Sequence, residues 1–137
     1  TNAEVGTHNV TIRANDGTVD TDQSFVITVS NTNDATVITS TAVTTATEDV
    51  SYTYNITTSD DDSDVPTITA PTLPAWLSLT DNGDGTASLT GTPTNAEVGT
   101  HNVTIRANDG TVDTDQSFEI TRASCSERVE ISVDAGT

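Results

Sequence analysis

The feature that most constrains this chain is an internal repeat, in which residues 1–25 recur letter for letter at residues 94–118. The match decays from Val26 onward, which corresponds to Glu119 in the second copy. Chance does not produce 25 consecutive identities, and a fixed offset of 93 residues is typical of a tandem array of modules. The chain is therefore expected to contain copies of one structural unit.

The offset also sets the boundaries of the predicted units. Because the repeated segment ends a module, its first copy has no complete module in front of it. The missing strands belong either to a longer protein or to another molecule that completes the unit in trans. We interpret the chain as the last third of a preceding module with its linker, one complete module, and a divergent tail with a further strand, at residues 1–34, 35–122 and 123–137.

Strand periodicity is the dominant local pattern, and no window has helical periodicity. Thr, a β-branched residue that favours strands, occupies 30 positions. Apolar residues alternate with polar ones at Val50, Tyr52, Tyr54 and Ile56 and again around Val103. Six or seven short strands in about 88 residues predict an all-β chain that folds as an antiparallel sandwich.

Two further signals refine the predicted sandwich. Trp76 is the single Trp, so we expect it to be buried against the strand that carries Val103 and Ile105. The Asp81–Gly85 segment lies between Leu-containing runs and predicts a hairpin turn that requires positive φ at Gly or Asn. The partial unit at 1–34 offers two strands, and an isolated hairpin is marginally stable in water.

The charge excludes several classes of function. Acidic residues outnumber basic ones by 21 to 4, which gives a net charge of −17. Such a surface repels phosphate backbones and anionic lipids, so we expect no nucleic-acid partner. No apolar run is long enough for membrane insertion. Carboxylate oxygens do suit hard cations such as Ca²⁺.

Several motifs in the second half of the chain carry a family resemblance. The runs Leu73–Leu79, Leu89–Thr94 and Val103–Gly110 resemble bacterial dystroglycan-type cadherin-like modules, which are also described as immunoglobulin-like (Ig-like) tandem repeats. The resemblance implies a Greek-key immunoglobulin/cadherin-like β-sandwich strung in a tandem repeat array. It also implies a secreted or cell-surface protein that serves adhesion, spacing, or contact with glycans or proteins.

The resemblance also implies calcium at the junction between consecutive modules. Cadherin modules use an acidic residue before a late strand, an Asn/Asp-rich linker and an Asp-x-Asp pair, and this chain has these elements in order. The implied junction ligands are Glu4, Asn31, Asn33, Asp34, Asp60, Asp62 and Asp109, with Glu48 and Glu97 at a distal site. Acidic loops are also common as solvated turns, and that reading stays open.

Catalysis has little support in the sequence. His8 and His101 are expected to be core or edge residues, because neither has a second metal ligand at suitable spacing. Cys125 is a lone thiol that is either free or bridged to another molecule.

The leading hypothesis is therefore a calcium-stiffened structural or adhesive repeat module and not an enzyme. Its partners would be neighbouring repeat modules, identical chains, or a cell-surface protein or glycan. One alternative is a carbohydrate-binding module of a secreted enzyme. Another is an extracellular fibre subunit completed by strand exchange, because unpaired strand edges invite pairing with other chains.

Overall fold

The computed structural model describes residues 1–123 of the 137-residue chain. The further strand expected in the divergent tail, and Cys125, lie outside the described residues. Ten strands and two single-turn 3₁₀ helices make up the described part, and the prediction of an all-β chain is confirmed. In chain order they are η1 (Asn2–Glu4), β1 (Gly6–Asn15), β2 (Asp20–Val29), β3 (Val37–Ile38), β4 (Thr45–Ala46), β5 (Tyr52–Ser59), β6 (Thr67–Thr72), β7 (Leu77–Asp81), β8 (Thr86–Gly91), η2 (Asn95–Glu97), β9 (Gly99–Asn108) and β10 (Asp113–Arg122).

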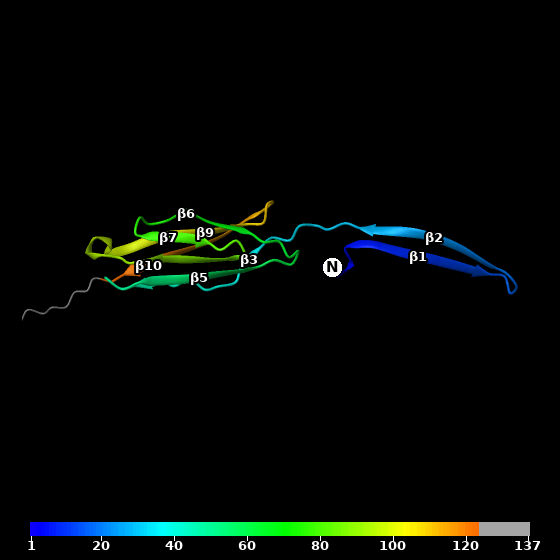
Figure 1. Ribbon diagram of the computed structural model, residues 1–137, viewed down its shortest axis with the longest axis horizontal. Coiled ribbons are helices and arrows are strands. Elements are labelled where there is room, and N and C mark those ends of the chain that lie inside the picture. Colours follow the sequence, from blue (N-terminus) through cyan, green and yellow to red (C-terminus); the bar gives the residue numbers. More distant parts are fainter. Residues whose placement is uncertain (124–137) are drawn as a thin grey trace, which may run out of the picture.

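Eight of the strands form two four-stranded sheets that pack as a sandwich (Figure 1). One sheet has the order β3-β5-β8-β7 and the other has the order β4-β10-β9-β6. This is the strand arrangement of an immunoglobulin-like sandwich, in which neighbours along the sheet are not always neighbours along the chain. The predicted Ig-like sandwich is therefore confirmed.

One strand pair departs from the antiparallel arrangement that the sequence predicts. β4 pairs with β10 in parallel, with Thr45 opposite Thr121 and Ala46 opposite Arg122. The reason is that the chain crosses from one sheet to the other between β3 and β4. The first two strands of the module therefore lie in different sheets, with β3 at the edge of one and β4 at the edge of the other.

The core lies between the two sheets and follows the predicted alternation. Tyr54 and Ile56 of β5, Leu89 of β8, and Ile105 and Ile120 of the other sheet are all at most 2% exposed. Because successive strand residues point to opposite faces, their polar neighbours face solvent.

Trp76 is only partly buried, at the edge of this core, so the prediction that it is buried is confirmed in part. Its ring packs edge-on against Tyr52 and against His101 of β9, with ring centroids 5.8 Å apart in each pair. The strand it meets is the expected one. Gly91 lies beneath it, and a Cβ there would come 2.2 Å from the Trp76 carbonyl oxygen. Only Gly therefore permits this close approach.

The Asp81–Gly85 segment connects β7 to β8 as a tight turn, as the sequence predicts. Gly83 and Gly85 have φ values of 73° and 82°, the left-handed conformation that Gly adopts at little cost. Asp81 and Asp84 accept backbone N–H hydrogen bonds within the turn, from Gly83 and Thr86. The acidic residues here hold a turn.

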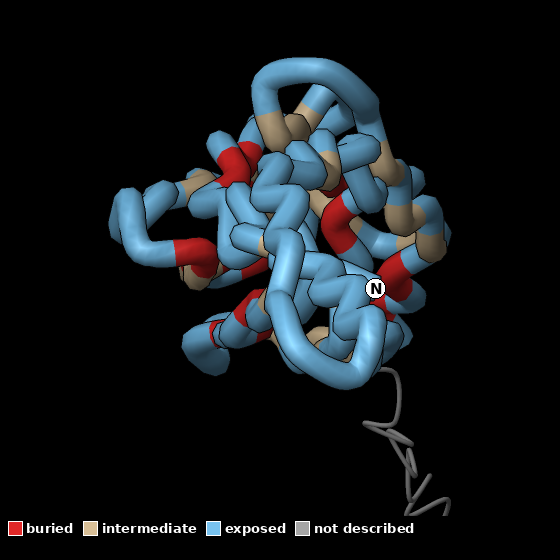
Figure 2. The backbone as a smooth tube through the Cα atoms, turned by 90° about the vertical axis from the view of Figure 1, so that its right-hand side faces the viewer, coloured by how far each residue is buried: buried red, intermediate tan, exposed pale blue. Residues whose placement is uncertain are grey.

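The first copy of the repeat forms a separate two-stranded hairpin beyond the sandwich (Figure 1). β1 and β2 pair over their full length, from Gly6 opposite Val29 to Asn15 opposite Asp20. The hairpin is almost entirely exposed, as the pale tube nearest the viewer in Figure 2 shows. Within the described part of the chain, no second layer covers these two strands.

Candidate metal centre at the junction

The linker between β2 and β3 meets two loops of the sandwich. The first loop joins β5 to β6 and carries Asp60–Asp64, and the second joins β9 to β10 and begins with Asp109. Six of the seven junction residues predicted from the sequence lie in these three segments.

Asp60 organises its own loop. Its Oδ1 accepts backbone N–H hydrogen bonds from Asp62 at 2.9 Å and from Asp64 at 3.2 Å. Its Oδ2 accepts the hydroxyl of Thr36, which is 1% exposed, at 2.7 Å. Ser63 adopts a left-handed φ of 66° to complete the turn. The loop is therefore folded so that Asp60, Asp62 and Asp64 share one side.

Asp62 binds the linker directly. Its Oδ1 accepts the side-chain amide of Asn31 at 2.9 Å, and its Oδ2 accepts the backbone N–H of Asp34 at 2.6 Å. One carboxylate thus holds both ends of a four-residue stretch of linker. The orientation of the linker at this point depends on Asp62.

Asp109 holds the middle of the same stretch. Its Oδ2 accepts the side-chain amide of Asn33 at 2.9 Å, while its Oδ1 accepts the backbone N–H groups of Thr111 and Val112, each at 2.7 Å. The Asn33 hydrogen bond, followed by those from Val112 and Thr111, lowers the pKa of Asp109. The second loop is therefore fastened to the linker by a charge-stabilising contact.

Glu4 is the one junction residue that turns away from this group. Its carboxylate accepts the hydroxyl of Thr1, and this hydrogen bond lowers the pKa of Glu4. Its neighbour Asn2 makes the junction contacts instead. The Asn2 amide donates to the Asp61 carbonyl oxygen at 2.9 Å and to Asp34 Oδ2 at 3.2 Å. Sequence reasoning missed Asn2, because an amide in a 3₁₀ turn carries no distinctive pattern.

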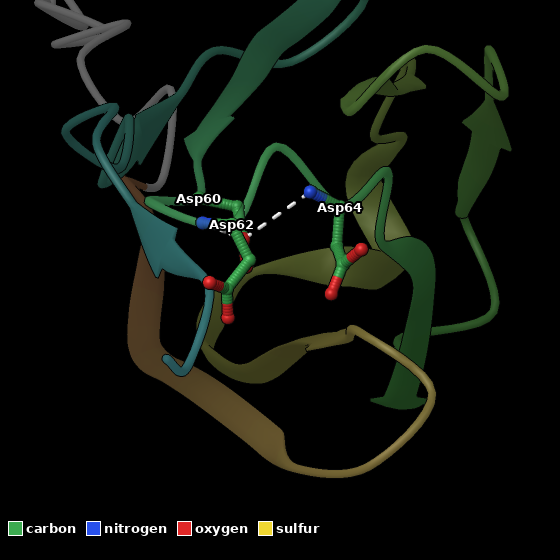
Figure 3. Close-up of side chains that lie close together, drawn as sticks. All are labelled: Asp60, Asp62 and Asp64. Atoms are coloured by element: carbon green, nitrogen blue, oxygen red, sulfur yellow. Dashed lines mark hydrogen bonds between the residues drawn. The ribbon is translucent and has the colours of Figure 1, made fainter. Parts of the chain in front are cut away.

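Sequence reasoning also missed a third carboxylate in the first loop. Asp60, Asp62 and Asp64 each place an oxygen within 4.8 Å of the other two (Figure 3). The alternation Asp-x-Asp-x-Asp was the signal that could have found Asp64. Ca²⁺ takes six to eight oxygen ligands from carboxylates, carbonyls and waters, so this group supplies part of a shell.

Among the described residues, no Arg side chain forms an ion pair with the carboxylates at the junction. Arg13 binds Asp20 and Asp22, and Arg106 binds the corresponding residues of the second copy. Arg122 binds Glu48. An open crevice of about 310 Å³ borders the site, lined by Asn2, Val5, Asn31, Asp61, Asp62 and Ser63. The donor set therefore fits a hard divalent cation in chemistry and in charge.

The two residues proposed for a distal site have protein partners instead. Glu48 Oε2 lies 2.8 Å from the Nη2 atom of the fully buried Arg122. Glu97 accepts the backbone N–H and hydroxyl of Thr94, which lowers its pKa and caps η2. Neither residue belongs to a three-carboxylate group within residues 1–123. A distal calcium site stays a prediction from the resemblance alone.

The two histidines occupy structural positions. His101 is half-buried against Trp76, and its Nε2 lies 2.7 Å from the Glu97 carbonyl oxygen. His8 makes the same contact with the Glu4 carbonyl oxygen in the exposed hairpin. His101 is thus the edge residue that the sequence predicts. Within residues 1–123, no helix has the length and apolar character needed to cross a membrane.

The sandwich and the sequence together define the class of protein. A family model described as "Putative Ig domain" matches residues 35–123, which is most of the chain. The chain therefore belongs to this family of immunoglobulin-like domains. The Ig-like part of the resemblance is thereby confirmed. No curated protein matches the chain.

Solved structures with the same fold come from enzymes and adhesins. An endo-fucoidan hydrolase of glycoside hydrolase family 107 superposes with a TM-score of 0.58 and 26% identity over 89% of this chain. This chain spans only 19% of that hydrolase chain. The SrpA adhesin of Streptococcus sanguinis matches with a TM-score of 0.58 and 17% identity, over 67% of this chain and 58% of the adhesin chain.

A second streptococcal adhesin extends the comparison. The sialic acid binding region of the Streptococcus sanguinis SK1 adhesin, bound to 3'sLn, has a TM-score of 0.54 at 11% identity. The match covers 89% of this chain and 39% of that one. At these identities the two adhesin matches show the fold alone.

Proposed function

We propose that this chain is a spacing and adhesive segment of an extracellular protein, and that calcium at the junction stiffens the joint between consecutive units. In this proposal the chain is not a catalyst, and its partners are neighbouring modules and a glycan or protein on another surface. The observation that carries the proposal is the convergence of the linker on Asp62 and Asp109.

The joint has a physical reason to need a cation. Asp60, Asp62 and Asp64 place carboxylate oxygens within 4.8 Å of one another, well inside the Debye length of about 8 Å. Their mutual repulsion opposes the folded loop on a chain that carries 17 net negative charges. A cation that binds only the folded form would add stability by mass action.

The described residues indicate which groups would hold the ion. Asp60, Asp62 and Asp64 would supply carboxylate oxygens, with Asp34 and Asp109 beside them and the side-chain amide oxygens of Asn31 and Asn33 completing the set. Bound Ca²⁺ would supply positive charge and a preference for six to eight oxygen ligands. The protein residues would orient the linker around that charge, so the hairpin and the sandwich would move less relative to each other.

Calorimetric titration of the chain with calcium tests this proposal. We expect saturable binding in the range from micromolar to about millimolar. Chelator should then lower the melting temperature, and Asp62→Ala or Asp109→Ala should abolish that calcium dependence. Asp84→Ala is the matched control, because Asp84 lies in the β7–β8 turn, where it binds Thr86.

Two results would count against calcium. The first is the absence of binding heat at millimolar calcium. The second is an equal loss of calcium dependence in the Asp84→Ala control. Either result would leave the acidic loops as solvated turns that hold the linker through the hydrogen bonds described above.

A carbohydrate-binding role is the second candidate. It is favoured by the 26% identity to a segment of an endo-fucoidan hydrolase. Against it, Tyr52 and Tyr54 pack inward and are 4% and 2% exposed, which leaves only the partly buried Trp76 and Phe118 as aromatic contacts on the described sandwich. A glycan array that includes sulfated fucans separates the two candidates. Binding to such glycans that persists in chelator would favour the carbohydrate-binding role.

A further inference from the structure

Residues 1–123 contain two hairpins of nearly the same sequence and one surface that covers such a hairpin. β9–β10 closes the sandwich, so Ile105 and Ile120 are completely buried. The corresponding residues of β1–β2 are Ile12 and Ile27, which are 54% and 47% exposed. Each of these two hairpins is therefore a candidate to pack against the remainder of the module, residues 35–93.

The contacts made by β9–β10 are available to β1–β2 almost in full. Tyr54 donates its hydroxyl to Gln116 Oε1 at 2.7 Å, and its ring packs edge-on against Phe118 with centroids 5.7 Å apart. In β2 the corresponding residues are Gln23 and Phe25. On contact chemistry alone, the surface of residues 35–93 does not distinguish the two hairpins at these positions.

Arg122 is the inward-facing residue that differs. It is fully buried, and its Nη2 atom lies 2.8 Å from Oε2 of Glu48, whose side chain is 15% exposed. The corresponding residue in β2 is Val29. Val29 at this position would leave the Glu48 carboxylate without a cation, and removing one partner of a buried ion pair is strongly destabilising. The other difference, Val26 for Glu119, lies on the solvent face.

We propose that residues 35–93 are an acceptor for hairpins of this sequence, including β1–β2 of a second copy, and that the Glu48–Arg122 pair makes β9–β10 the preferred occupant. The pair then acts as a specificity contact between two repeats that are otherwise alike. Without it, domain swapping between chains would cost little, because the exchanged elements are nearly identical.

The arrangement of the hairpin favours exchange between two chains over exchange within one. β10 ends at the end of the sandwich away from the β1–β2 hairpin (Figure 1). If β2 took the place of β10, Val29 would lie at that far end while β3 still begins at Val37. The eight residue steps between them reach at most about 28 Å, and a ten-residue strand alone spans about 30 Å. The occupant is therefore expected to come from a second copy.

A pair of introduced cysteines reports this exchange. Thr45 of β4 and Thr121 of β10 are exposed Cα partners, so T45C/T121C should form a disulfide in the normal closure. Thr28 corresponds to Thr121, and T28C/T45C should cross-link only when β2 occupies the β10 position. Both pairs are placed in a C125S background. The protein is refolded from urea at high concentration, so that the two hairpins compete.

We expect little cross-linked dimer from T28C/T45C alone. Adding V29R gives β2 the residue that binds Glu48, and the dimer fraction should rise about tenfold, which is the effect of about 1.4 kcal/mol. V26R is the matched control, because it adds the same charge on the face that lies outward in the module. Neither variant alters the sandwich itself, so folding is preserved, and the T45C/T121C disulfide checks it.

The E48Q variant tests the mechanism. With Glu48 neutralised, V29R should no longer raise the dimer fraction above the level of Val29. The proposal is overturned if V29R and V26R give equal dimer, or if the V29R effect survives E48Q. It is also overturned if no T28C/T45C dimer forms in any variant while T45C/T121C cross-links normally.

Discussion

The two copies of the repeated segment have the same local structure in different surroundings. In both, an Arg in the first strand binds two Asp residues in the second: Arg13 binds Asp20 and Asp22, and Arg106 binds Asp113 and Asp115. The turns are held alike, by Asp16 in one copy and Asp109 in the other. Burial differs, because among residues 1–123 a sheet packs over the second copy and not over the first.

The comparison separates local from tertiary contributions in one molecule. Turn chemistry, cross-strand ion pairs and β propensity are encoded within 25 residues, and they are sufficient to specify a hairpin geometry twice. The hydrophobic contribution to stability comes from packing against residues 35–93, and in the described structure the second copy makes that packing. The two hairpins should therefore share a conformation and differ in stability.

Hydrogen exchange should give the largest difference between the copies. Amides paired between β9 and β10 exchange mainly through global opening, whereas those of an uncovered hairpin exchange through local opening. We expect protection at least about 100-fold higher in β9–β10, which corresponds to about 3 kcal/mol. Exchange read by NMR in a monomeric sample measures it. Equal protection in the two hairpins would show that β1–β2 is covered as well.

Truncating one equivalent side chain in each copy should give the next largest effect. Ile105→Ala removes a fully buried side chain and should cost about 2–5 kcal/mol of unfolding free energy. Ile12→Ala affects a side chain that is 54% exposed and should cost within about 0.5 kcal/mol. Urea unfolding followed by Trp76 emission measures the cost of Ile105→Ala, and amide hydrogen exchange within β1–β2 measures the cost of Ile12→Ala. Similar costs at the two positions would contradict the assignment of the core to one copy.

The fold was predictable because its signals are local and repeated. Alternation at Tyr52, Tyr54 and Ile56 indicated the inward face of β5, and these residues are buried. The partial exposure of Trp76 and the parallel β4–β10 pair were not predictable. Both depend on which segments meet across the sandwich, and that is decided by the chain crossing between sheets and by the space left above Gly91.

The junction was predictable in composition and less so in detail. The resemblance pointed to Asp60, Asp62 and Asp109, and the linker does meet the two loops that carry them. The roles of Glu4 and Glu48 could not be read from the sequence. Glu4 binds the hydroxyl of Thr1, and Glu48 binds Arg122, which lies 74 positions away along the chain. The spacing and periodicity of residues in the sequence do not reveal a pair that is so far apart along the chain.

A smaller difference should appear at the two histidines. His8 and His101 each lie 2.7 Å from a carbonyl oxygen four residues earlier, but only His101 packs edge-on against Trp76, with centroids 5.8 Å apart. Aromatic pairs of this geometry contribute about 0.5–1.5 kcal/mol. His101→Ala should therefore cost about 1 kcal/mol more than His8→Ala in thermal or urea unfolding. Equal costs would mean that the ring contact contributes nothing.

The smallest effect should come from acid, and it compares the two turn aspartates. The pKa of Asp16 is lowered by hydrogen bonds from the backbone N–H groups of Val19 and Thr18. The pKa of Asp109 is lowered first by the side chain of Asn33 and then by the corresponding backbone groups. Asp109 should therefore titrate at lower pH than Asp16, and carboxyl carbon NMR titration measures both.

The sign of the pH dependence follows from these lowered values. A carboxylate with a folded pKa below its unfolded value of about 3.9 stabilises the fold above that pH. The contribution is lost as the pH falls through the lower folded pKa, because a protonated carboxyl group accepts the Asn33 hydrogen bond more weakly than a carboxylate does. Asn33→Ala should raise the pKa of Asp109 toward that of Asp16 and leave Asp16 unchanged. If Asp109 did not shift in this variant, the linker would not be held at that position in solution.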